Sequence, residues 1–333
     1  MALLEVQHIS KHQQDRILID DINFQQDVLQ KIAITGESGA GKSTLLKIIS
    51  GHVQADGGTV LFNGERVIGP EEKLLAGHKD IAYLSQHYEL HNNYVVKDLV
   101  WFQIKVDEAE ATQLFEICRI SHLLERKTNL LSGGEKQRIA LCMLLVKHPK
   151  LLILDEPFSN LDPIHKTTLK AVLEEITERL QITCLLASHD PHDTLSWADE
   201  IIVMKEGEIV QQGTPQQIYY HPMNEYVAGM FGKYNFLIPE QASFFGIESN
   251  GKDVMIRPES FVINENDGVK GTIQKISFWG GFYEVEVVVN NLKIIVRSND
   301  NEWEVDIEIF INYHKYATEY SKKTNTDIFY FIK

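Results

Sequence analysis

The chain has little of what several protein classes need. Its 333 residues include only three cysteines, Cys118, Cys142 and Cys184, and no two stand at the spacing of a metal or redox pair. We therefore expect three buried thiols in a reducing compartment, the cytoplasm. No apolar run approaches the roughly 18 residues of a membrane-spanning helix. Met1 to Lys11 also lacks the residue order of a signal peptide. Work at a membrane would need another chain as the anchor.

Positive charge is also scarce. Lys and Arg number 32 against 47 Asp and Glu, which gives a formal net charge of -15. Because binding to nucleic acid needs clustered Lys and Arg, this balance argues against a general nucleic-acid binder, and it leaves open only a local basic patch. With 44% hydrophobic and 24% charged residues, the composition predicts an ordinary globular protein. The length favours about two domains.

A glycine-rich loop lies between a predicted strand at 32–34 and a predicted helix at 44–50. Its residues are Gly36, Glu37, Ser38, Gly39, Ala40, Gly41, Lys42 and Ser43. The glycines let backbone N–H groups approach phosphate oxygens, and the helix dipole adds positive charge there. Lys42 is placed to reach the β- and γ-phosphates, and Ser43 to offer a hydroxyl to Mg²⁺. The loop predicts a triphosphate site; a flexible Gly/Ser loop is the alternative.

An acidic pair, Asp155-Glu156, ends the apolar run 151–154, which is typical of a buried parallel strand. Open α/β sheets bind ligands at that end of their strands. Asp155 is placed to assist Mg²⁺, directly or through water, and Glu156 to polarise a water that attacks the γ-phosphate. A solvated acidic pair is the alternative.

Hydrophobic periodicity predicts the remaining elements. We expect antiparallel strands at 3–9 and 17–24, a strand at 80–85 that leads to Gln86, and helix-favouring sequence from about 88 to 150 that includes a helix at 108–120. A hairpin is expected at 201–212 and helical sequence at 213–232. After Pro239 the pattern turns to β, with a hairpin around Asn290-Asn291 and a strand at 303–311.

Between the loop and the acidic pair stands Leu131-Ser132-Gly133-Gly134-Glu135. This sequence is similar to LSGGE, the signature of the ATP-binding cassette (ABC) ATPases, and the three motifs come in that family's order. Gln86 resembles the family's Q-loop glutamine, 159–162 its D-loop, and His189 its switch histidine. Independently of the family, Ser132 and two glycines before an amphipathic run predict a helix N-terminus that can bind an anion.

The resemblance implies an α/β P-loop ATPase fold, a mixed sheet with helices and a helical subdomain, and it implies ATP and Mg²⁺ as cofactors. Residues 36 to Thr44 would hold the phosphates, with Lys42 also catalytic, and Ser43, Gln86 and Asp155 would serve Mg²⁺. Glu156 would be the general base, His189 would orient water and the γ-phosphate, and Gln86 would sense the metal. In a head-to-tail homodimer, the γ-phosphate would face Ser132, Gly133 and Gly134 of the second copy, and Asp162 would line the seam.

Two positions depart from the family pattern. Gln13 stands where an aromatic residue usually stacks on adenine, and 141–144 read Leu-Cys-Met-Leu instead of Ala-Arg-Ala-Leu. We expect the first departure to weaken adenine binding and the second to affect packing.

The sequence after residue 212 resembles bacterial importers of the maltose, sulfate, polyamine and ferric-iron group. Residues 213–237 resemble the end of their ATPase domain, and 255–259 resemble the start of their small OB-like β-domain. We expect an ATPase domain at 1–235, with its helical subdomain at about 88–150, and a β-rich regulatory domain at 236–333.

The implied function is the ATP-hydrolysing subunit of an importer, held at the inner face of the membrane by a permease and working through it with a solute-binding protein. An exporter's ATPase is one alternative. A soluble ABC ATPase of DNA repair or translation is the other; it is disfavoured by the single phosphate loop, by the acidic balance and by the lack of sustained heptads between Gln86 and Leu131. The solute is not encoded in this chain.

Overall fold

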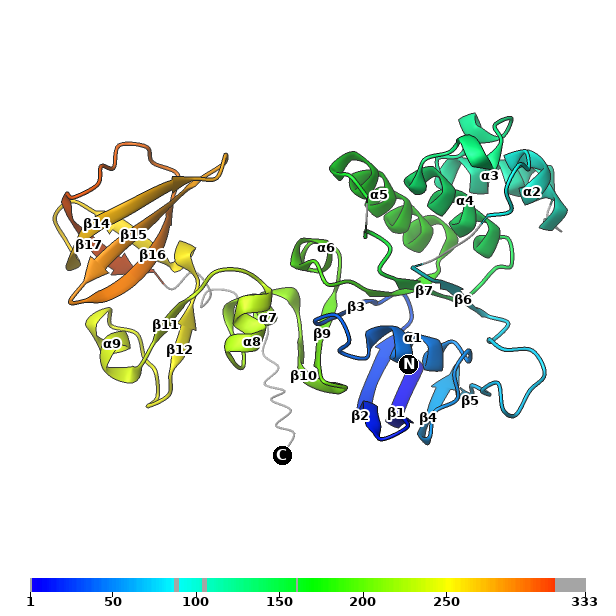
Figure 1. Ribbon diagram of the computed structural model, residues 1–333, viewed down its shortest axis with the longest axis horizontal. Coiled ribbons are helices and arrows are strands. Elements are labelled where there is room, and N and C mark those ends of the chain that lie inside the picture. The colour runs from blue at the N-terminus through cyan, green and yellow to red at the C-terminus, as the bar shows by residue number, and fades with distance from the viewer. Residues whose placement is uncertain (1, 87–89, 104–106, 160, 315–333) are drawn as a thin grey trace. The chain divides into compact units, whose positions relative to one another are not determined.

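The computed structural model describes residues 2–86, 90–159 except 104–106, and 161–314, with no account of the side chains of 102 and 103. The chain forms two compact units, 1–215 and 216–333 (Figure 1). The domain boundary expected after residue 235 lies inside the second unit and stays a prediction.

The first unit contains two sheets. The four-stranded antiparallel sheet has the order β2 (Arg16–Asp27), β1 (Ala2–Gln13), β4 (Gly57–Phe62), β5 (Glu65–Arg66). The six-stranded sheet has the order β10 (Glu208–Gly213), β9 (Glu200–Lys205), β3 (Lys31–Thr35), β8 (Thr183–Ala187), β7 (Leu151–Asp155), β6 (Ile81–Leu84). Only β10 pairs antiparallel in this second sheet, so the expected mixed sheet is confirmed.

Six α-helices and two short 3-10 helices are described in this unit: α1 (Lys42–Ile49), α2 (Val96–Gln103), α3 (Glu108–Ile117), η1 (Ser121–Leu123), η2 (Thr128–Leu130), α4 (Gly133–Leu145), α5 (Pro163–Leu180) and α6 (Pro191–Leu195). Asp107 caps α3 by accepting from the N–H of Glu110, and Ala111, Leu114 and Phe115 form its buried stripe. The helix is shorter than predicted because Arg119 takes a left-handed φ of 55°.

The core of the first unit joins both sheets to α1. It includes Leu4 and Ile22 from the antiparallel sheet, Ile34 and Ile153 from the other sheet, and Leu46 from α1, all at most 1% exposed. Because α1 packs into this core, the phosphate loop that precedes it has a rigid base. None of the helices in the described residues is long and apolar enough to cross a membrane.

In the second unit, short helices precede an antiparallel five-stranded sheet. The elements before the five-stranded sheet are α7 (Pro215–Tyr220), α8 (Glu225–Met230), β11 (Asn235–Leu237), α9 (Pro239–Phe244), β12 (Val254–Ile256) and η3 (Pro258–Ser260), and β11 pairs with β12. The five-stranded sheet has the order β13 (Phe261–Asn264), β17 (Glu308–Tyr313), β14 (Val269–Phe278), β15 (Tyr283–Val289), β16 (Leu292–Ser298). The all-β domain that the sequence predicts at the end of the chain is confirmed by this five-stranded sheet.

The details of the second unit correct two predictions. Helix α9 interrupts the expected β pattern because Pro239 starts a helix well and the Gln241 side chain accepts from the N–H of Ile238. The strand expected at 303–311 begins only at Glu308, after Asp306 turns the chain with a φ of 68°. The hairpin is confirmed: Asn290 and Asn291 take φ of 49° and 65°, as a two-residue turn requires.

Candidate active site

The glycine-rich loop joins the end of β3 to the start of α1, as the sequence predicts. A Cβ atom at Gly36 would lie 2.3 Å from the carbonyl oxygen of Met204, and one at Gly41 would lie 2.6 Å from that of Leu18, so both positions admit only glycine. Lys42 is 6% exposed, and its Nζ donates to the carbonyl oxygens of Gly36 at 2.7 Å and Glu37 at 3.0 Å. The ammonium group therefore lies inside the loop.

Asp155 ends β7 directly beside this loop. The hydroxyl of Ser43 donates to its Oδ1 at 2.9 Å, and the hydroxyl of Tyr83 donates to its Oδ2 at 2.8 Å. Asp155 as a whole is 4% exposed. Burial lowers the pKa of Lys42, and the nearby charges of Glu156 and Asp155 oppose that effect only in part. The structure thus brings together the hydroxyl and carboxylate oxygens that Mg²⁺ prefers.

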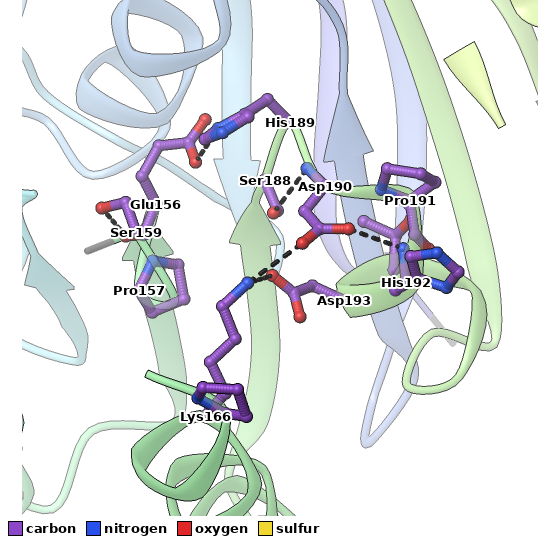
Figure 2. Close-up of polar contacts among 12 residues, drawn as sticks. Glu156, Pro157, Ser159, Lys166, Ser188, His189, Asp190, Pro191, His192 and Asp193 are labelled. Carbon is purple, nitrogen blue, oxygen red and sulfur yellow. Dashed lines mark hydrogen bonds and ion pairs between the residues drawn. The ribbon is translucent and has the colours of Figure 1, made fainter. Parts of the chain in front are cut away.

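Glu156 follows the last residue of β7 and has a left-handed φ of 52°. Its backbone N–H donates to the carbonyl oxygen of Ala187 at 2.9 Å and so stabilises this conformation. Its Oε2 lies 2.7 Å from Nδ1 of His189, and its Oε1 lies 3.8 Å from Nζ of Lys42. Figure 2 shows the Glu156 and His189 side chains pointing toward one another. A carboxylate between an ammonium group and an imidazole can take a proton from water beside a bound phosphate.

Comparison with known proteins agrees with this geometry. Residues 19–159 match the family model for the ABC transporter, and residues 254–311 match that for the TOBE domain. The chain is 31% identical to the spermidine/putrescine import ATP-binding protein PotA of Clostridioides difficile. The alignment is 347 positions long and covers 97% of this chain and 99% of that protein. The chain belongs to the ABC transporter ATP-binding proteins.

Two further similarities support the same family. Over 314 residues the chain is 31% identical to the sulfate/thiosulfate import ATP-binding protein CysA of Synechocystis sp., covering 88% of this chain and 87% of that protein. The solved structure of CbiO1 from Clostridium perfringens, part of the ABC transporter complex CbiONQ, has a TM-score of 0.58 and 29% identity over 65% of this chain and 90% of that one. As an ABC ATPase, the chain binds nucleotide and hydrolyses ATP.

The ABC signature forms a capped helix start. Ser132 caps α4: its Oγ accepts from the N–H of Glu135 at 3.3 Å, and the Glu135 side chain accepts from the N–H of Ser132 at 2.8 Å. Gly133 has open space around its Cα, whereas a Cβ atom at Gly134 would lie 2.7 Å from the His165 ring. Ser132 is thus paired within its own helix start and not with the residues around Lys42.

Asp162 caps the next helix, α5. Its Oδ1 accepts from the N–H groups of Ile164 and His165, both at 3.0 Å, and its Oδ2 lies 2.7 Å from Nδ1 of His165. Gln86 is exposed and follows β6, the edge strand that pairs with β7. Residue 160 of the predicted D-loop lies outside the described residues.

Gln13, in the place of the adenine-stacking aromatic, ends β1 and pairs with Arg16 across a two-residue turn. It is exposed. The neighbouring ring, His12, is tied to Asp56, whose Oδ2 accepts from the His12 N–H at 2.6 Å and lies 3.5 Å from its Nδ1.

Sequence reasoning missed Tyr83 and Lys166. Neither residue belongs to one of the sequence motifs described above. Each donates a hydrogen bond to a carboxylate outside its own element: Tyr83, on β6, to Asp155, and Lys166, on α5, to Asp190. A polar residue inside the strand before Gln86 and a cation one turn after Asp162 were the available signals.

Proposed function

We propose that this chain is the ATP-hydrolysing subunit of an ABC importer, with an ATPase domain at 1–235 and a β-rich regulatory domain at 236–333. It works at the inner face of the membrane through separate permease subunits and, through them, with a solute-binding protein. The proposal is supported by relatives named as import ATP-binding proteins that align over nearly their whole length, and by the TOBE domain at 254–311.

The Glu156 carboxylate, between Lys42 and His189, is the observation that carries the catalytic part of the proposal. Glu156 takes the proton of the attacking water, and His189 orients that water and the γ-phosphate. The Lys42 ammonium exchanges its loop carbonyls for phosphate oxygens and stabilises the charge of the transferring group.

Ser43, Asp155 and Gln86 are the proposed residues for Mg²⁺. The 2.9 Å contact between the Ser43 hydroxyl and the Asp155 carboxylate fits such a site, because Mg²⁺ in nucleotide sites takes few protein oxygens and keeps phosphate and water ligands. Bound Mg²⁺ would neutralise charge on the phosphate oxygens.

A second copy of the chain completes each site in this proposal. The exposed start of α4, with Ser132, Gly133 and Gly134, is a helix N-terminus that can face the γ-phosphate held by Lys42 of the partner copy. Asp162, at the start of α5, lines the same seam.

The test is Glu156→Gln, which keeps the size of the side chain and removes the base. The variant should bind ATP, lose hydrolysis, and elute as a dimer in size-exclusion chromatography with Mg-ATP, whereas the unaltered chain dimerises transiently. Glu178→Gln, an exposed position on α5, is the matched control. Full hydrolysis by Glu156→Gln, or only monomers of both proteins at high concentration, would contradict the proposal. Identifying the membrane proteins that copurify with the chain distinguishes import from export.

A further inference from the structure

Two lysines on α5 face two aspartates that follow the switch histidine. Nζ of Lys166 lies 3.0 Å from Oδ2 of Asp190 and 3.2 Å from Oδ2 of Asp193. Figure 2 shows the Lys166 amine between these two carboxylates. Lys170, one turn further along α5, is paired with Asp193 at 3.2 Å and donates to the carbonyl oxygen of His192 at 3.1 Å. Lys166 therefore bridges the two aspartates, while Lys170 holds the second.

The bridge is partly shielded from water. The Asp193 side chain is 4% exposed, and a carboxylate buried that far needs a cation. Burial by itself would lower the pKa of Lys166, but its hydrogen bonds to Asp190 and Asp193 outweigh burial and raise it. Burial by itself would raise the pKa of Asp190. The hydrogen bonds that its carboxylate accepts from Lys166 and from the N–H of His192 outweigh burial and lower that pKa. Both partners are thus charged at neutral pH.

The bridge anchors the backbone on one side of His189. The His189 side chain is 62% exposed, and its Nδ1 contacts Oε2 of Glu156. Because so little of the ring is packed, its position depends on the backbone of the residues before and after it. Before it, the N–H of Ser188 donates to the carbonyl oxygen of Ile34 at 3.0 Å, which fixes the loop to β3. After it, Asp190 is held by Lys166. Asp190 also donates its N–H to the Ser188 hydroxyl at 3.2 Å and accepts from the N–H of His192 at 3.0 Å. Removing the Lys166 amine would take away the contact that ties Asp190 to α5.

The same lysine lies in the first turns of α5, whose start contacts the signature helix. Asp162 caps α5, and His165 packs against Gly134 so closely that a methyl group there would not fit. A shift of the start of α5 against α4 would therefore move Lys166, and with it Asp190.

We propose that Lys166 is a positioning residue for ATP hydrolysis: it holds Asp190 and so sets where the His189 ring meets Glu156, and it links that loop to the start of α5. The inference rests on the proposed roles of Glu156 and His189. Since a misplacement of about 1 Å at a reacting group can cost about a hundredfold in rate, one lost anchor has a measurable effect on turnover.

The experiment compares three variants of the full chain in steady-state ATP hydrolysis. In Lys166→Met, kcat should fall about tenfold or more while KM for ATP stays within about twofold, because the ATP contacts are untouched. Lys166→Arg keeps a cation between the aspartates and should restore most of kcat. Lys170→Met, which also loses an ion pair with Asp193, should keep kcat within about threefold.

A purely structural ion pair would behave differently. Equal losses of kcat in Lys166→Met and Lys170→Met, a raised KM with unchanged kcat, or no rescue by Lys166→Arg would overturn the inference. If Lys166→Met does not fold, Asp190→Asn removes the same pair while keeping a side chain that caps α6, and it should show the same loss of kcat.

A second measurement does not need turnover. In ¹⁵N-histidine NMR spectra, with the His189 signals assigned by His189→Gln, Lys166→Met should shift these signals and Lys170→Met should leave them in place. Unshifted signals in Lys166→Met would overturn the inference. An unaltered chain that hydrolyses no ATP would instead count against the proposed function, and the spectra would still test Lys166.

Discussion

At the scale of single residues, Asp155 shows how one carboxylate is fixed from two sides. Ser43 and Tyr83 each donate to one of its oxygens, at 2.9 and 2.8 Å. Burial and the charge of Asp155 raise the pKa of Tyr83 well above its usual value, so the phenol keeps its proton and stays a donor. The ring itself lies 5.5 Å from that of His52. Tyr83 thus contacts the carboxylate through its hydroxyl.

Tyr83→Phe tests that role because it removes the hydroxyl and keeps the ring. A hydrogen bond to a charged group is worth about 1.5–3 kcal/mol, so Asp155 should be held less firmly and Mg²⁺ affinity should fall by about ten- to a hundredfold. Titration with Mn²⁺ followed by electron paramagnetic resonance, in the presence of ATP, measures the change. Tyr94→Phe, at a side chain that is 55% exposed, is the control. Unchanged metal affinity would show that Ser43 and Asp155 suffice.

Gln13 carries the second prediction at this scale. An aromatic ring stacked on a base is worth about 1–3 kcal/mol, and an amide lacks most of it. We expect weak discrimination between ATP and GTP, and Gln13→Tyr should tighten ATP binding several-fold.

Binding titrations with both nucleotides check the Gln13 prediction. His12 is the nearest ring, but its partner is Asp56, and adjacent side chains on a strand point to opposite faces. A strong ATP preference that disappears in His12→Ala would show that the histidine does the stacking.

At the scale of elements, contiguous signals were predictable and contacts between elements were not. The loop 36–43, the strand 151–154 and the Asn290-Asn291 turn each encode their geometry in neighbouring residues, so sequence alone found them. Helix α3 stopped early because of one left-handed residue, Arg119, which no local rule demands. Lys166 and Tyr83 act through partners 24 and 72 residues away, and only the folded chain reveals such pairs.

Arg257 is another element-scale contact, inside the second unit. The residue is 1% exposed, and its guanidinium carbon lies 4.2 Å from the centre of the Tyr219 ring. It donates to four carbonyl oxygens at 2.7–3.1 Å, those of Tyr219, Ala228, Gly232 and Lys233. These acceptors lie in or next to α7 and α8, so Arg257 ties both helices to the segment that leads into the five-stranded sheet.

Arg257→Met should therefore destabilise the second unit. Losing the guanidinium leaves buried carbonyl groups without donors, and we expect the free energy of unfolding to fall by about 2–4 kcal/mol. Calorimetry of the full chain measures this loss. Lys270→Met, which breaks an exposed ion pair with Glu308, should change it by less than about 1 kcal/mol. Equal effects of the two substitutions would contradict a role for Arg257 in holding α7 and α8.

At the scale of the whole molecule, each unit has its own apolar core. The first core takes its residues from the two sheets and α1, and the second takes them from positions after 236, such as Leu237, Ile273 and Ile311. The residues proposed for catalysis, Lys42, Gln86, Glu156 and His189, all belong to the first unit. The proposed catalytic residues and the proposed regulatory domain thus lie in different units of the chain.

A chain that ends at Gly232 should therefore still hydrolyse ATP. It keeps the whole first core and every proposed catalytic residue, while the loss of Arg257 returns the carbonyl groups of residues 219–232 to water, which can accept their hydrogen bonds. We expect a rate within a few-fold of the full chain, measured as phosphate release at saturating Mg-ATP, with Glu156→Gln in the same truncated chain as the blank. An insoluble or inactive product would mean that the tail covers apolar surface of the ATPase domain, and regulation by the β-rich domain would then have to be tested in the full chain.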